Sequence, residues 1–223
     1  MRKLVHVRFP FESAAVNHVK FSLFPAEYRG LELLRDLSSE VLDSVQILSQ
    51  MLGAPDDEQA GLAAGLNSTE ARATDRHYAV LTHLRTSYVN PLPREDLYTF
   101  SRLLHEAVEQ LSGAGDLIVH TGAGRLSRRA AEQLEIIGRQ AELASAAIGQ
   151  LNNLDDLEDT WLEMVRLSKR ASRTHRVWVA EVSDLQKASA IVRHRYVADQ
   201  MLSAVHSLRA VADHLGRILV KES

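Results

Sequence analysis

Proline is confined to the first part of this chain of 223 residues. All five prolines lie at or before Pro93, so the 130 residues that follow contain no residue that must break a helix. Aromatic residues make up only 5% of the chain, and cysteine is absent. The proline distribution favours an all-α fold. The lack of cysteine excludes disulfide scaffolds, thiolate metal sites and cysteine nucleophiles.

The charges of the chain are nearly balanced, with 26 Lys and Arg against 29 Asp and Glu and a net charge of -3. Nonspecific nucleic-acid binding needs a clearly basic domain, so we expect no nucleic-acid partner. The longest uncharged stretches, Ser44–Pro55 and Leu143–Leu154, fall short of the ~20 residues of a transmembrane helix. His6, Arg8 and Glu12 interrupt any signal-peptide core. We therefore expect a cytoplasmic protein without a transmembrane segment.

Apolar residues recur at three- and four-residue spacing along most of the chain after Pro25. The pattern predicts six helices, at about residues 25–53, 67–89, 93–111, 126–151, 155–185 and 189–221. Residues 56–67 contain Gly61 and Gly65 and are predicted as a loop that could hold a short helical turn. Asn67 and Glu70 have the capping-box spacing that would start the next helix. Four glycines between residues 112 and 124 predict a second loop or hinge.

These elements divide into two groups of three, which is compatible with an internal duplication but does not establish one. Helices of about 30 residues favour an antiparallel bundle. Residues 1–24 show no sustained period and are predicted to be an N-terminal arm. Residues 25–223 would form a single helical domain with repeats at about 25–120 and 125–223.

The most distinctive stretch is Leu84–Leu97, which reads LRTSYVNPLPREDL. It resembles the L-x-x-T-F-I-T-P-I-D-R-E-D-I segment of the PhoU-like family, in the branch of Pit accessory proteins or phosphate-transport regulators. Residues Phe21–Pro25 and Ala212–Lys221 are similar to the opening and the ending of the same family. The family signature in this chain consists of Pro91, Arg94, Glu95 and Asp96.

The resemblance implies a PhoU-like six-helix bundle of two three-helix repeats. It also implies a non-enzymatic regulator or accessory of inorganic phosphate transport, with an inorganic phosphate permease as its partner. Peripheral association with the membrane and a homodimer formed by the long amphipathic helices both stay open.

The PhoU-like family also carries four pairs of acidic residues, spaced four apart on facing helices, that ligate clusters of metal ions. No pair keeps both carboxylates at the matching positions here, which are Glu70 and Thr74, His105 and Glu109, Ser168 and Ser172, and Leu202 and His206. A shift of one residue would let Asp75 take the place of Thr74. The alternative function is a metal-binding bundle with a divalent or iron-type ion in the first repeat. Its ligands would be Glu70, His105, Glu106 and Glu109. An interaction scaffold unrelated to phosphate is a third alternative.

The run Lys169–Arg176 is strongly basic. It could bind an acidic partner, phosphate or lipid headgroups, although a solvated helix face is the simpler interpretation. The sequence has no Gly-x-Ser-x-Gly motif and no phosphate-cradling Gly-Lys-Ser/Thr ending, so we expect no enzymatic activity.

Overall fold

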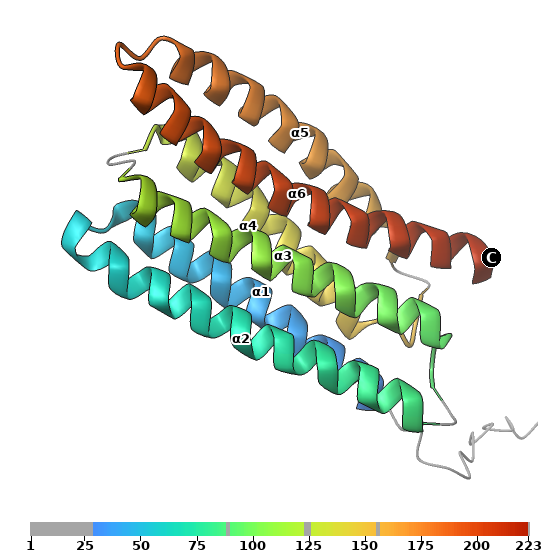
Figure 1. Cartoon of the computed structure of the whole chain (residues 1–223). Coiled ribbons are helices and arrows are strands. Elements are labelled where there is room, and N and C mark those ends of the chain that lie inside the picture. The colour runs from blue at the N-terminus through green and yellow to red at the C-terminus, as the bar shows by residue number, and fades with distance from the viewer. Residues whose placement is uncertain (1–28, 88–89, 123–125, 155–156, 223) are drawn as a thin grey trace, which may run out of the picture.

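The computed structural model describes residues 29–87, 90–122, 126–154 and 157–222, and the predicted arm at residues 1–24 lies outside them. The described residues fold into six helices without a strand (Figure 1). The helices are α1 (Arg29–Gly53), α2 (Asp56–Thr86), α3 (Arg94–Thr121), α4 (Arg128–Gly149), α5 (Leu157–Ser183) and α6 (Ala188–Glu222). The predicted all-α antiparallel bundle is confirmed. None of the described helices is apolar over a length sufficient to cross a membrane.

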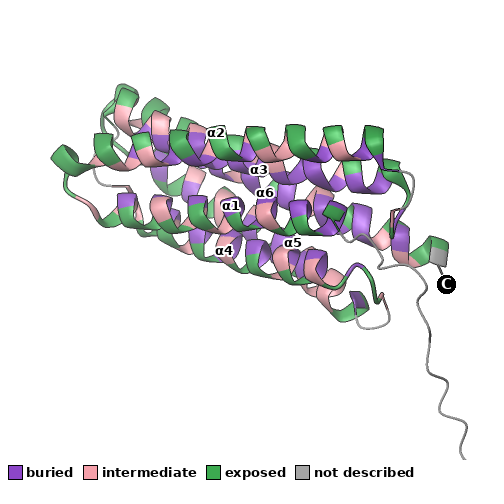
Figure 2. Ribbon diagram, turned by 90° about the horizontal axis from the view of Figure 1, so that it is seen from below, coloured by how far each residue is buried: buried purple, intermediate pink, exposed green. Residues whose placement is uncertain are grey.

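Four helices form the centre of the bundle, and two cover its edges. The helix α2 packs on α1 and α3, whereas α5 packs on α4 and α6. The two groups of three meet where α1 contacts α4 and where α3 contacts α6. Each outer helix therefore has one face that no other described helix covers, and exposed residues line that face of α2 in Figure 2.

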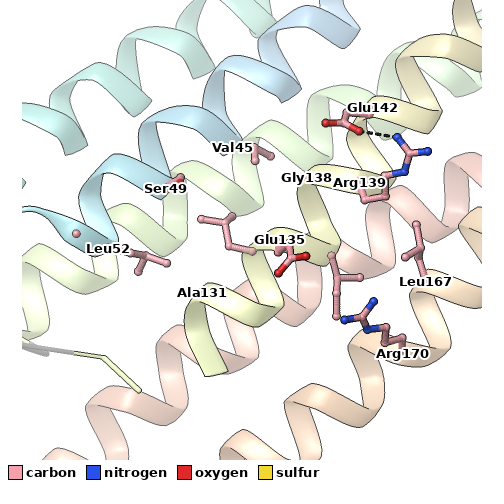
Figure 3. Close-up of a pocket in the computed structure, with 13 residues that line it drawn as sticks. Val45, Ser49, Leu52, Ala131, Glu135, Gly138, Arg139, Glu142, Leu167 and Arg170 are labelled. Carbon is pink, nitrogen blue, oxygen red and sulfur yellow. Dashed lines mark hydrogen bonds and ion pairs between the residues drawn. The ribbon is translucent and has the colours of Figure 1, made fainter. Parts of the chain in front are cut away.

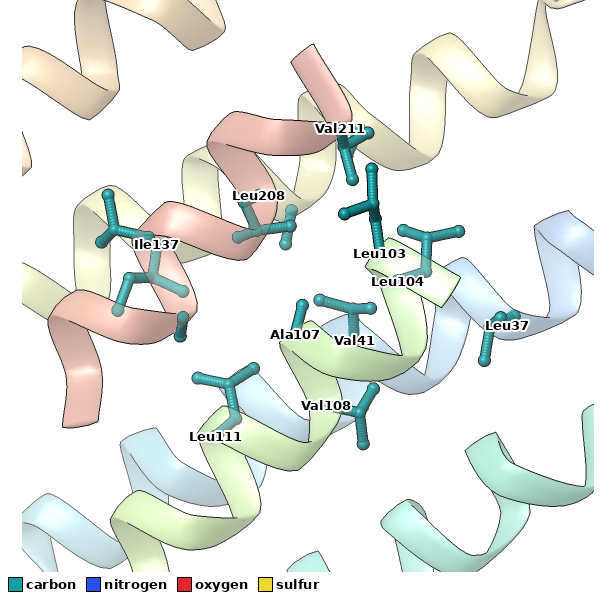
Figure 4. Packing of buried hydrophobic residues seen from close by; sticks show 14 of the residues in the cluster. Leu37, Val41, Leu103, Leu104, Ala107, Val108, Leu111, Ile137, Leu208 and Val211 are labelled. Atoms are coloured by element: carbon teal, nitrogen blue, oxygen red, sulfur yellow. The ribbon is translucent and has the colours of Figure 1, made fainter. Parts of the chain in front are cut away.

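The core lies between the four central helices, where apolar side chains from both halves interdigitate (Figure 4). Val41 of α1 and Leu104 of α3 point toward the same interior as Ile137 of α4 and Leu208 of α6. All four side chains are at most 1% exposed. Burial of this kind contributes about 1.5–3 kcal/mol for each large aliphatic side chain.

The two halves bury residues at the same intervals, which is the structural trace of a repeat. In α2 and α5, residues at a constant separation along the chain are buried in both helices, namely Leu66 and Met164, Ala73 and Ala171, Val80 and Trp178, and Leu84 and Val182. The inner helices α3 and α6 match in the same way at Phe100 and Val197, Leu104 and Met201, and Leu111 and Leu208. The assembly of two three-helix repeats is thus built on one burial pattern, although few residue types are shared.

The predicted loop at residues 56–67 is wrong, because α2 begins at Asp56 and continues through both glycines. Asp56, Asp57 and Glu58 lie in its first turn, where carboxylates interact favourably with the helix dipole. Packing against α1 and α3 outweighs the helix-weakening effect of Gly61 and Gly65. The expected capping residues Asn67 and Glu70 therefore lie inside the helix.

The predicted hinge at residues 112–124 is also largely wrong, since α3 continues to Thr121. A side chain at Gly115 would meet Leu66 of α2, so this glycine permits a close approach of two helices instead of a bend. Gly122 ends the helix with φ 57°, and its backbone N–H donates to the carbonyl oxygen of Val119 at 3.1 Å. A left-handed glycine after the last turn is a common helix stop.

Candidate functional site

Polar side chains of the first repeat gather between α2 and α3 in a group that we call the histidine cluster (Thr74, His77, His105 and Glu109). Thr74 Oγ1 and His105 Nε2 share a hydrogen bond of 2.9 Å. Glu109 Oε2 lies 3.7 Å from His105 Nδ1. The ring of His77 stacks on that of His105, with 5.3 Å between centroids and 16° between planes. Positions 74 and 105, which belong to two different acidic pairs of the family pattern, therefore face each other.

The surroundings of His77 favour its neutral form. Burial lowers the pKa of His77, and the positive charges of His105 and Arg102 lower it further. Its Nδ1 lies 3.1 Å from Ser101 Oγ, a spacing that resembles a nucleophile with its base. However, Ser101 is fully buried and donates its hydroxyl to the carbonyl oxygen of Tyr98 at 2.9 Å. This pair is therefore not placed to attack a substrate.

The other two predicted metal ligands lie apart from this cluster or point away from it. Glu70 is half-buried on α2, one turn before Thr74. Glu106 pairs with Arg102 at 3.1 Å and lines a cavity of about 290 Å³ between α3 and α6. Adjacent helical positions are about 100° apart at 3.6 residues per turn, so His105 faces α2 while Glu106 faces α6. The predicted ligands are thus divided between two helix interfaces.

Among the described residues, no group of three or more His, Asp or Glu side chains could hold a metal ion. Of the predicted ligands, His105 and Glu109 approach each other within 4 Å. A cluster of hard cations needs several carboxylate oxygens from facing helices. The residues present therefore do not fit the metal cluster that the family implies. Binding of a single ion by Glu70, His105, Glu106 and Glu109 stays a prediction, which elemental analysis of the purified protein can test.

The matching positions in the second repeat use their polar atoms internally. Ser168 is buried, accepts a hydrogen bond from Gln140 Nε2 at 2.8 Å and donates one to the carbonyl oxygen of Met164 at 2.9 Å. Ser172 donates to the carbonyl oxygen of Ser168 at 3.0 Å. The opposite positions on α6 carry the half-buried Leu202 and the exposed imidazole of His206. This part of the repeat offers no anionic ligand.

One turn further along, the second repeat forms a contact that the sequence analysis missed. His175 Nε2 lies 2.8 Å from Asp199 Oδ1, and Arg195 Nε lies 3.4 Å from Asp199 Oδ2. His175 occupies in α5 the position that His77 occupies in α2. The spacing of Arg195 and Asp199, four residues apart, could have indicated an ion pair on one helix. The contact with His175 depends on the register of two helices and has no local signal.

Arg94 and Asp96, two of the signature residues, stabilise the turn between α2 and α3 and connect it to α6. Arg94 Nη2 donates to the carbonyl oxygen of Ser87 at 2.6 Å. Asp96 is only 4% exposed, and its Oδ1 lies 3.3 Å from His214 Nε2 and 3.6 Å from Lys221 Nζ. Burial lowers the pKa of His214, while the nearby Asp96 carboxylate opposes that shift. The signature thus links the first turn of α3 to the last turns of α6.

The remaining signature residues lie on the surface of the same corner. Pro91 is exposed beside the buried Leu92, and Glu95 is exposed in the first turn of α3. A carboxylate at that place favours the helix dipole. In this chain the signature residues therefore have a structural role: they shape the turn between α2 and α3 and attach it to α6.

A groove of about 710 Å³ runs between α1, α4 and α5 (Figure 3). Its walls include Val45 and Leu167, and its rim carries Arg139, Glu142 and Arg170. Arg139 Nη1 is paired with Glu142 at 2.7 Å. Arg170 makes no ion pair with the described residues. The groove therefore combines an apolar floor with the unpaired Arg170, and the carboxylate of Glu135 lies in the same lining.

No model of a known protein family matches the sequence, and no curated protein resembles it at a significant level. The fold is similar to that of a solved structure described as a PhoU-like protein from Shewanella oneidensis MR-1. The two structures superpose with a TM-score of 0.74 at 12% sequence identity. The match covers 86% of this chain and 99% of the other. This chain therefore has a PhoU-like fold.

Proposed function

We propose that this protein is a non-enzymatic regulator or accessory of inorganic phosphate transport and that it acts by docking to a permease. The observation that carries the proposal is the PhoU-like bundle closed by the Pro91–Asp96 corner, because fold and signature point to one family independently. The buried hydroxyl of Ser101 in the Ser–His pair supports a role without catalysis.

The proposal is tested in the source organism by deleting the gene and measuring uptake of radiolabelled phosphate. We expect uptake, or its response to external phosphate, to change and to be restored by the wild-type gene. In parallel, the full-length protein should co-purify with an inorganic phosphate permease identified by antibody. Unchanged uptake in the deletion strain, together with no permease in the purified fraction, would refute the proposal.

A further inference from the structure

The net charge of -3 is the sum of a basic segment and an acidic remainder of the chain. Residues 166–196 contain eight Lys and Arg but only two Asp and Glu, a local charge of +6. The rest of the chain therefore carries -9. The basic segment consists of the second part of α5 and the first turns of α6.

The basic residues of α5 form a straight stripe on its outward face. Arg166, Lys169, Arg173 and Arg176 are spaced by three, four and three residues, so they lie above one another on the helix. All four are exposed, and they lie opposite the buried side that contains Ala171. Figure 1 shows α5 at an edge of the bundle, and among the described helices it packs only on α4 and α6. Because the stripe lies opposite the buried side of α5, it faces away from the bundle. It is about 15 Å long at 1.5 Å per residue.

These charges are not neutralised within the described part of the protein. Lys169, Arg173 and Arg176 make no ion pair there, and Arg166 has a single contact of 3.5 Å with Glu163. The nearby carboxylate of Glu181 is already paired with Arg129 of α4 at 2.9 Å. Like charges at neighbouring helical positions destabilise a helix. An anionic partner would relieve this repulsion.

The same basic segment carries exposed apolar side chains. Val177 follows Arg176 on α5 and is 39% exposed, while Val192 and Tyr196 of α6 are 47% and 55% exposed. The contact of His175 with Asp199 brings this part of α6 against α5. Cationic side chains beside exposed apolar and tyrosine side chains are typical of surfaces that lie on an anionic bilayer.

We propose that the basic platform (Arg166, Lys169, Arg173, Arg176, Val177, Val192 and Tyr196) binds the surface of an anionic phospholipid bilayer. The positive charges match the headgroups. The apolar side chains favour a bilayer over a nucleic acid, whose phosphate backbone offers them no apolar phase. The inference rests on the charge and exposure of this surface and does not depend on the proposed role in phosphate transport.

The test is co-sedimentation of the full-length protein with vesicles, which contain no transporter. We expect binding to mixed phosphatidylcholine and phosphatidylglycerol vesicles but not to pure phosphatidylcholine, and we expect salt to weaken it. The triple variant Lys169→Glu, Arg173→Glu and Arg176→Glu should bind at least tenfold more weakly, given about fivefold per basic residue. Circular dichroism would verify that the variant is folded.

The matched control is the triple variant Arg85→Glu, Arg102→Glu and Arg217→Glu, which changes the net charge equally at exposed sites on α2, α3 and α6. It should retain most of the binding. Val192→Ser with Tyr196→Ser should weaken the binding that persists at high salt. Failure to bind the mixed vesicles at low salt, or equal losses in both triple variants, would overturn the proposal. Binding to polyglutamate without binding to vesicles would assign the platform to an acidic protein instead and would also overturn it.

Discussion

The outer helices α2 and α5 occupy equivalent places in the two repeats but differ in the charge of their surfaces. In the middle of α2, residues 68–78 contain two acidic and two basic residues, whereas residues 166–176 of α5 contain five basic and no acidic ones. The buried positions nevertheless coincide, as Ala73 and Ala171 show. The burial pattern is therefore what both repeats share, while their charged faces are free to differ.

One pair of matched arginines shows how the difference arises. Arg72 of α2 pairs with Glu40 of α1 at 2.8 Å, and Glu40 is only 2% exposed. The matching residue of α5 is Arg170. At the separation along the chain that aligns the buried residues of α1 with those of α4, the place of Glu40 is taken by the apolar Leu143. With no carboxylate at this place, Arg170 makes no ion pair with the described residues and lies at the rim of the groove. The positive charge on the surface of α5 is therefore due in part to the absence of this carboxylate from the described residues of α4.

The largest effect that distinguishes the repeats is expected at Trp178 of α5, which is fully buried where α2 has the smaller Val80. Trp178→Ala should lower the free energy of unfolding by about 3–5 kcal/mol, because it leaves a large cavity. Val80→Ala removes two buried methyl groups and should cost roughly 2 kcal/mol. Urea unfolding followed by circular dichroism measures both. Equal losses would show that the two outer helices are anchored alike.

An intermediate effect is expected at the buried carboxylate of the first repeat. Glu40→Gln weakens its contacts with Arg72 and with Arg76, whose Nε lies 2.7 Å from Glu40 Oε1. Both arginines are partly exposed and can be hydrated, so we expect a loss of about 1–2 kcal/mol. The control is Glu142→Gln, which breaks an exposed pair with Arg139 and should cost less than about 0.5 kcal/mol. If the control costs as much as Glu40→Gln, the buried pair gives the first repeat no special stability.

The smallest effect concerns pH. Because burial lowers the pKa of His77 in the folded protein, the unfolded chain takes up a proton first as pH falls through the ordinary histidine range near 6.5. The free energy of unfolding should therefore decrease on acidification through that range and be fully regained above it. His77→Gln should reduce this slope, measured by urea unfolding at a series of pH values. An unchanged slope would mean that the histidine cluster does not make the first repeat sensitive to acid.

Much of the fold could be predicted from sequence because helix periodicity is local. The stop at Gly53 and Pro55 and the start after Pro93 agree with α1 and α3. The start of α2 could not be predicted, since its glycines are held in a helix by packing that the local sequence does not encode. The candidate site was harder to predict from sequence. The resemblance placed the pairs 70/74 and 105/109 on facing helices, and Thr74 does contact His105. The stacking of His77 and the contact of His175 with Asp199 depend on how distant helices align.

The interdigitated centre of the bundle has a consequence for how the chain folds. Each repeat supplies two of the four helices that enclose the core, and its inner face is apolar. A half separated from the other would present that face to water, which is the condition for self-association. The two halves are therefore expected to unfold in a single cooperative transition although each has the same arrangement of helices. The contacts of Asp96 with His214 and Lys221 join the two halves.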